Sequence, residues 1–300
     1  MRIASNTVSD NIIREIQQLA SQQAKLQNEV STGQRISQPE DDPAAVDRIL
    51  NLRNESRELA QFSSNANRAL EISQATFAGL TELKKTSDRA TEIGTLGNGA
   101  IGADARQAYG AELDQLIEQA IQLGNSKLGN DYLYAGAAVD QAPIVATRDA
   151  NGQVTAVTYA GDAQPAGIPL SATSSVTPFT DGATNQSMAG FINHLVALRD
   201  GLNHNDSAAI TAAQSSLLDT ENVLVSAVAE QGAVQTRIET SQSQQAAVSQ
   251  NLDSLVSDET SADLPSTIVR LNQAQTAYQA ALQSAAKIMQ TSLLDYLPVS

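Results

Sequence analysis

The sequence predicts a mainly α-helical protein: an elongated bundle of long antiparallel helices, with coiled-coil helices at both ends of the chain and a small β-rich insert. Two proline-free stretches, residues 44–142 and 179–264, carry apolar residues at helical spacing. Four of the eight prolines lie between them. Aromatic residues make up only 3% of the chain, and tryptophan is absent. A core of small aliphatic residues suits slender helical packing better than a thick globular centre.

Each end of the chain repeats apolar residues in alternating steps of four and three. The N-terminal set is Ile12, Ile16, Leu19, Gln23, Leu26 and Val30. The C-terminal set is Leu264, Ile268, Leu271, Gln275, Tyr278, Leu282, Ala285 and Met289, with Leu294, Tyr296 and Leu297 at its tip. A repeat of about 3.5 residues keeps one narrow seam facing a partner helix, and the single glutamine in each seam can fix the register. Ordinary amphipathic helices on a globular core are the alternative.

The polar face of the C-terminal segment is nearly uncharged. Between Pro265 and Pro298 the charged residues are Arg270, Lys287 and Asp295. Such a face can pack against further copies of the chain without removing ions from water. Either end helix alone would be marginal in water. We therefore predict that the two seams form an assembly interface.

The stretch "STGQRISQPEDDPAAV" places acidic residues between two prolines. Gly33 and Arg35 are expected to end the first helix, because glycine tolerates the left-handed conformation found there. Asp42 suits the N-cap of the next helix and Pro43 its first position. Asp41 is expected to act only through the helix dipole. A calcium loop needs alternate ligands and a central glycine, which this stretch lacks, so we predict a structural helix-cap turn.

The chain divides into three predicted parts. Residues 1–35 and 264–300 are the terminal coiled-coil domain, and residues 36–129 and 188–263 form a helical rod domain. Residues 130–187 contain short runs of β-branched residues, in which apolar and polar residues partly alternate. Residue pairs that favour tight turns, Asn151-Gly152 and Gly161-Asp162, separate these runs. This segment forms the predicted β-rich outer insert.

Composition excludes several kinds of partner and site. The net charge of −15, from 18 basic and 33 acidic residues, argues against a nucleic-acid or anionic-membrane partner. The absence of cysteine excludes disulfides and cysteine-based zinc sites. No stretch has the apolar run of a secretory signal or of a membrane span. We expect neither membrane insertion nor a cleaved signal peptide.

Catalytic signatures are weak. The stretch "GNGAIG" fits a dinucleotide-binding pattern on paper, but it follows a helical segment rather than a strand. The two histidines, His194 and His204, have no nucleophile elbow or strand scaffold near them in sequence. We predict no catalytic residue, no cofactor and no metal site, and therefore not an enzyme.

Four stretches carry a family resemblance. They are the opening "MRIASNTV", the turn "STGQRISQPEDDPAAV", the block "GNGAIGADARQAYGAELDQLIEQAIQLGNSKLGNDYLYAG" and the close "LNQAQTAYQAALQSAAKIMQTSLLDYL". Together they resemble the bacterial flagellin superfamily, over about residues 1–136 and 263–297. The "SLLDYL" ending is more similar to the hook–filament junction branch than to filament flagellins.

The resemblance implies an extracellular structural subunit of the flagellum, at the junction of hook and filament. It implies polymerisation through paired terminal helices, with itself, hook-associated protein 1 and flagellin as partners. It also implies delivery by an export chaperone and the flagellar type III export apparatus, without a cleaved signal peptide. Two alternatives remain: a flagellin that forms the filament itself, and another exported coiled-coil assembly protein.

Overall fold

The computed structural model describes residues 2–164 and 166–294, with side chains over residues 10–164 and 166–288. Most of this part of the chain is helical. The helices are α1 (Arg2–Thr32), α2 (Pro43–Gly97), α3 (Ala103–Gly124), α4 (Gly182–Asn203), α5 (Ser207–Thr260) and α6 (Leu264–Leu294). The predicted mainly α-helical fold is confirmed.

The chain forms two compact units. One comprises residues 1–57 and 249–300, and the other comprises residues 58–248. The terminal unit therefore includes the first turns of α2 and the last turns of α5, beside α1 and α6. The predicted division into coiled coil, rod and insert draws its boundaries elsewhere and stays a prediction.

The unit of residues 58–248 has a main apolar core, to which α2, α3, α4 and α5 contribute, and a smaller apolar cluster that includes Ala66, Leu170 and Ile238. Hydrogen bonds to α5 show that α2 and α5 are antiparallel: Asn98, just after α2, donates from Nδ2 to Thr211 Oγ1 at 3.1 Å, and Ser73 Oγ of α2 donates to Gln231 Oε1 at 2.9 Å. The largest fully buried side chains are Tyr134, Phe191, Leu80, Leu83, Ile93, Leu113, Ile117, Met188, Ile192, Leu195, Leu198 and Leu202. The core is thus largely aliphatic, as the composition predicts.

Three short antiparallel pairs lie between α3 and α4 in the chain. They are β1 (Lys127–Leu128) with β2 (Asp131–Tyr132), β3 (Ile144–Arg148) with β4 (Val154–Tyr159), and β5 (Ile168–Pro169) with β6 (Ser175–Val176). In the turn after β3, Asp149 Oδ1 accepts hydrogen bonds from Asn151 N and Gln153 N, both at 2.9 Å. Gly152 has a φ of 84°, which glycine adopts without strain. The small β-rich insert of the predicted fold is present.

Asparagine amides occupy both outer edges of the β3–β4 hairpin. Asn125, just after α3, donates from Nδ2 to Ile144 O at 2.8 Å and accepts from Ile144 N at 2.9 Å. Asn193 of α4 makes the same pair of bonds with Val157, both at 2.8 Å. Exposed strand edges offer free N–H and C=O groups to other chains. Here the two amides take up such groups and fix the hairpin to α3 and α4.

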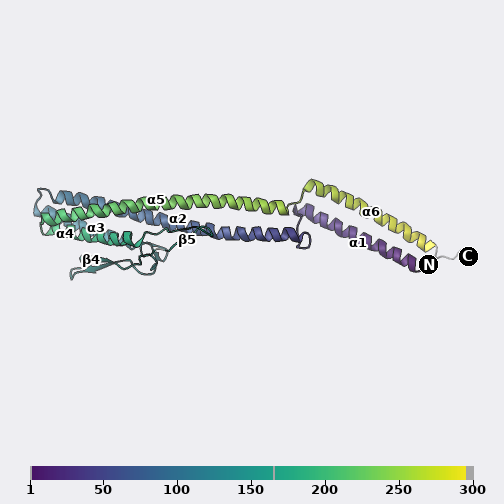
Figure 1. Ribbon diagram of the computed structural model, residues 1–300, viewed down its shortest axis with the longest axis horizontal. Helices are drawn as coiled ribbons and strands as arrows, with labels where there is room; N and C mark the ends of the chain where they lie inside the picture. The colour runs from purple at the N-terminus through teal and green to yellow at the C-terminus, as the bar shows by residue number, and fades with distance from the viewer. Residues whose placement is uncertain (1, 165, 295–300) are drawn as a thin grey trace. The chain divides into compact units, whose positions relative to one another are not determined.

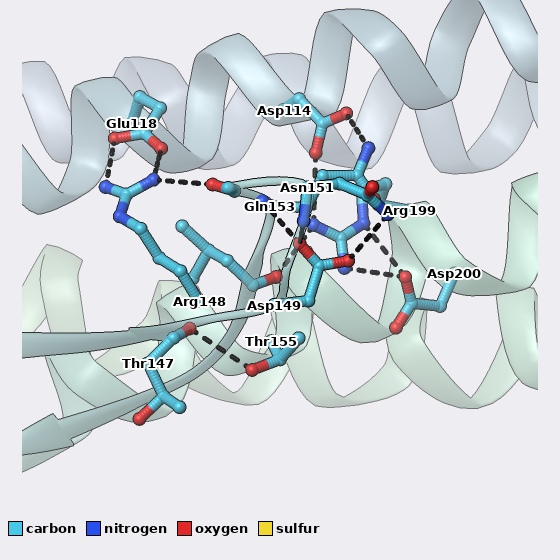
Figure 2. A network of polar contacts seen from close by, with 12 residues as sticks. Asp114, Glu118, Thr147, Arg148, Asp149, Asn151, Gln153, Thr155, Arg199 and Asp200 are labelled. Carbon is cyan, nitrogen blue, oxygen red and sulfur yellow. Dashed lines mark hydrogen bonds and ion pairs between the residues drawn. The ribbon is translucent and has the colours of Figure 1, made fainter.

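A buried arginine joins this hairpin to both helices (Figure 2). Arg199 of α4 has a side chain only 3% exposed. Its Nη1 donates to Asp114 Oδ1 of α3 at 3.0 Å and to Val154 O at 2.8 Å. Nearer the surface, Arg148 of β3 forms a bidentate pair with Glu118 of α3. Two arginines therefore tie one hairpin to α3, one inside the fold and one at its surface.

Candidate functional site

The candidate site is the pair of terminal helices, α1 and α6, together with a joint next to them. The joint consists of the connection after α1 (residues 33–42), the connection after α5 (residues 261–263) and the adjoining ends of α2 and α5. Helices α1 and α6 pack along each other (Figure 1). On α1, Leu26 is buried, at 7% exposure. The other members of the predicted N-terminal seam, Ile12, Ile16, Leu19, Gln23 and Val30, are half-buried. The predicted seam of α1 is therefore its least exposed face.

The predicted seam of α6 is divided between two environments. Leu271, Gln275 and Tyr278 are half-buried and Ala285 is buried, but Leu264, Ile268 and Leu282 are 41%, 45% and 43% exposed. The buried residues of α6 are small: Ala285 of the predicted seam, and Thr267 and Ala274, which the prediction left out. Small side chains allow two helices to approach closely. Leu264, Ile268 and Leu282 lie beside this buried face, whereas Leu271 and Tyr278 are half-buried.

Four predicted interface residues lie partly or wholly outside the described part of the chain. The backbone of Met289 and Leu294 belongs to α6, but their side chains lie outside the described residues. Tyr296 and Leu297 lie outside the described residues altogether.

The turn between α1 and α2 has the geometry of two helix caps. α1 ends at Thr32, and Gly33 follows with a φ of 69°. α2 begins at Pro43, and Asp42 Oδ1 accepts a hydrogen bond from Ala45 N at 3.0 Å, as an N-cap does. Arg35 lies beyond the end of α1, in the joint rather than in the helix.

Asp41 contradicts its sequence-based interpretation. Its Oδ2 accepts hydrogen bonds from Ser37 N at 3.0 Å, Ser37 Oγ at 3.2 Å and Gln38 N at 3.0 Å. Its Oδ1 lies 2.7 Å from Lys25 Nζ of α1. Asp41 therefore organises the turn and links it to α1, whereas the sequence suggested an action through the helix dipole alone. The reason is that the chain folds back over residues 37–41, which spacing does not reveal.

Two chain connections, one after α1 and one after α5, are paired at the joint. Gln34 and Ser261 form an antiparallel bridge, in which Arg35 N donates to Thr260 O at 2.8 Å and Ala262 N donates to Gly33 O at 2.9 Å. These bonds join residues more than two hundred positions apart in sequence. The connection after α1 thereby supplies a partner to a carbonyl at the end of α5, which a helix leaves unsatisfied.

Arginine side chains complete the joint. Arg48 of α2 binds Glu259 of α5 through two bonds of 2.9 Å, from Nε and from Nη2. Arg35 donates from Nη2 to Glu259 O at 3.2 Å and from Nη1 to Asp42 Oδ2 at 3.1 Å. Beneath them lies a small apolar cluster of Ile36, Ala45, Ile49, Val46 and Val256. Sequence reasoning missed Arg48 and Glu259, because no local pattern relates two charges on distant helices.

The carboxyl groups of the joint are held in their charged form. The ammonium of Lys25, followed by the backbone N–H groups of Ser37 and Gln38, holds the pKa of Asp41 well below its usual range. The Ala45 N–H and then Arg35 lower the pKa of Asp42, and Arg48 lowers the pKa of Glu259. At pH values above its unfolded pKa, each carboxyl therefore favours the folded joint, though only slightly at the solvent-screened Asp42 and Glu259. That contribution is lost as the pH falls through the lowered folded pKa.

The described residues hold no group of three or more histidine, aspartate or glutamate side chains arranged to bind a metal ion. Over the same part of the chain, no helix has the length and apolar character needed to span a membrane.

Residues 3–138 match the family model of the bacterial flagellin N-terminal helical region. Over these residues the chain is similar to the bacterial flagellin family. The matched segment takes in α1, the capping turn, α2 and α3, and so includes half of the candidate site.

Two curated relatives share the same name. The chain is 26% identical to flagellar hook-associated protein 3 of Salmonella typhimurium over 147 residues, which are 48% of this chain and 46% of that protein. It is 25% identical to flagellar hook-associated protein 3 of Escherichia coli over 145 residues, again 48% and 46%. The chain thus spans about half the length of the curated relatives it matches.

Solved structures of the same kind share the fold. A putative flagellar hook-associated protein from Vibrio parahaemolyticus has a TM-score of 0.64 at 18% identity, covering 74% of this chain and 100% of that chain. Bacillus cereus FlgL has a TM-score of 0.59 at 16% identity, covering 69% and 99%. At these identities the likeness establishes the fold alone.

Proposed function

We propose that this protein is a structural subunit of the bacterial flagellum that joins the hook to the filament by polymerising through its terminal helices. Its partners would be further copies of itself, hook-associated protein 1 on the hook side and flagellin on the filament side. It would be extracellular, delivered by an export chaperone and the flagellar type III export apparatus without a cleaved signal peptide. The family match and the two relatives called hook-associated protein 3 support this proposal.

The observation that carries the proposal is the unpartnered apolar edge of α6. Leu264, Ile268 and Leu282 are all more than two-fifths exposed, and at 100° per residue they fall within about 40° of one another around the helix. Completing the burial of a half-exposed leucine or isoleucine is worth about 1 kcal/mol. In a polymer this gain repeats in every copy, and the nearly uncharged polar face beside it adds little desolvation cost.

A filament-forming flagellin would use the same surface, so location separates the two candidates. Gold-labelled antibody on intact flagella should mark the short zone between hook and filament. Label along the whole filament would favour the flagellin alternative, and label away from flagella would favour another exported assembly protein.

The surface itself is tested by Ile268→Gln, with Val145→Gln on the β3–β4 hairpin as the matched control. The two side chains are 45% and 46% exposed, respectively, so both changes should leave the monomer folded. We expect Ile268→Gln to abolish motility and to release flagellin into the medium, while Val145→Gln behaves as wild type. Equal behaviour of the two variants, with both folded and exported, would exclude α6 as the assembly surface.

A further inference from the structure

The joint between the terminal helix pair and the helices α2 and α5 is built as a fixed connection. After α5 the chain has only residues 261–263 before α6 begins, and after α1 it has residues 33–42 before α2 begins. Short segments of this kind are where hinge motion ordinarily takes place, because a few residues can absorb large changes in φ and ψ. In this chain the two segments are tied to each other by the Gln34–Ser261 bridge.

The arginines add constraints that the backbone bridge lacks. A guanidinium group binds a carboxylate through two parallel bonds in a fixed orientation. Arg48 binds Glu259 in this way, and so sets the angle between the start of α2 and the end of α5. Arg35 touches both the last turn of α5 and the N-cap of α2. The connection after α1 is thereby linked to the end of α5 through both the backbone and the side chain of Arg35, and α2 is linked to α5 through Arg48.

These contacts are too exposed to serve mainly for folding. The side chains of Arg48 and Glu259 are 55% and 28% exposed, and exposed ion pairs contribute little to the free energy of unfolding. The turn, α2 and α5 also share an apolar cluster in which Ile36, Ala45 and Ile49 are buried. At an exposed site, a bidentate pair such as Arg48 with Glu259 restricts the relative orientation of the two helices more than it adds to the free energy of unfolding.

We propose that Arg48, Glu259 and Arg35 form a lock that fixes the direction in which α1 and α6 leave the joint, so that they are positioning residues for assembly. The inference rests on the proposed polymerisation through the terminal helices and adds the device that presents those helices to a neighbouring copy. A helix pair free to swing would reach the bound arrangement only part of the time, and its apparent affinity would fall by that fraction.

The sequence offers a clean way to test the lock. Gln34 and Ser261 are a non-hydrogen-bonded antiparallel pair, whose Cα atoms ordinarily lie about 4.5 Å apart, a spacing that a disulfide can bridge. Because the chain has no cysteine, the pair Gln34→Cys/Ser261→Cys would form a single defined cross-link. It would fix the joint without arginine or glutamate and could be opened again with a reducing agent.

The experiment compares Arg48→Met/Glu259→Gln with wild type, with and without the cysteine pair, and uses Arg53→Met, an exposed arginine farther along α2, as the control. Thermal unfolding checks that every variant is folded, and light scattering with electron microscopy measures polymerisation of the purified full-length chain. We expect the lock variant to melt like wild type but to polymerise about tenfold more weakly. The reason is that only a fraction of its molecules would hold α1 and α6 in the orientation that binds a neighbouring copy. The oxidised disulfide should restore polymerisation, and reduction should remove it again.

Two results would overturn the lock. Normal polymerisation of the lock variant would show that the ion pairs have no positioning role. A loss that the disulfide does not restore would show that the arginine and glutamate contact a neighbouring copy instead. Failure of the proposed function looks different: wild type and Ile268→Gln would then polymerise equally well or not at all, whatever the state of the joint.

Discussion

Replacing Arg199 by methionine should destabilise the unit of residues 58–248 without affecting the terminal helices. Methionine keeps most of the side-chain volume but removes the guanidinium at the centre of the network in Figure 2. Three acceptors then lose a donor: Asp114 on α3, Asp200 on α4, and the carbonyl oxygen of Val154.

The size of the loss follows from how exposed each acceptor is. The side chains of Asp114 and Asp200 are 29% and 50% exposed, so water can replace most of what they lose. Val154 is 2% exposed, and an unsatisfied buried carbonyl costs about 1–3 kcal/mol. Removing a cation that is itself buried returns part of its desolvation cost. We expect a net loss of about 2–3 kcal/mol in the free energy of unfolding of this unit, or about 5–10 °C in its melting temperature.

The matched control is Arg148→Met on the same hairpin. Arg148 also pairs with a carboxylate of α3, but its side chain is 42% exposed, so its loss should be close to the experimental error. Thermal and urea unfolding followed by circular dichroism would measure both variants. Arg199→Met as stable as wild type, or Arg148→Met equally damaging, would refute the argument that burial decides the difference.

Two further changes test contacts that the sequence did not predict. Asp41→Asn should cost about 1–2 kcal/mol at neutral pH, because a charged acceptor of several bonds is lost at a partly exposed site. The pKa of Asp41 is lowered on folding, so the difference from wild type in the free energy of unfolding should be constant above about pH 5 and shrink as the pH falls further. Urea unfolding at several pH values would measure it. A difference that grows in acid would contradict this. Asn193→Ala should expose the hairpin edge and speed hydrogen exchange at the Val157 amide at least tenfold, the effect of losing about 1.4 kcal/mol of protection; exchange as slow as in wild type would show that the edge is closed by other contacts.

Sequence periodicity predicts well where the helices of this protein lie. It predicts less well which of their side chains contact a neighbouring helix. The seam of α1 was predictable because its apolar residues and its buried face coincide. The seam of α6 was only partly so, because hydrophobicity points to Ile268 and Leu282, whereas close packing selects Thr267 and Ala274. Small residues carry little hydrophobic signal, although they permit the closest helix contact.

The joint shows a second limit. Asp42 and Pro43 could be assigned from sequence because an N-cap is a local arrangement. The pairing of Arg48 with Glu259 spans 211 positions, so it depends on where the whole chain brings its ends. Charged residues on exposed helix faces are common, and spacing alone does not select the two that meet.

Assembly through the exposed edge of α6 is tested most directly by thiol labelling before and after polymerisation. With no native cysteine, Ile268→Cys reports on the α6 edge and Asn151→Cys on the hairpin turn. Both sites should react rapidly with a maleimide reagent in the monomer. In the polymer we expect Ile268→Cys to be protected and Asn151→Cys to stay reactive. Undiminished reaction at position 268 in a polymer seen by electron microscopy would contradict the account.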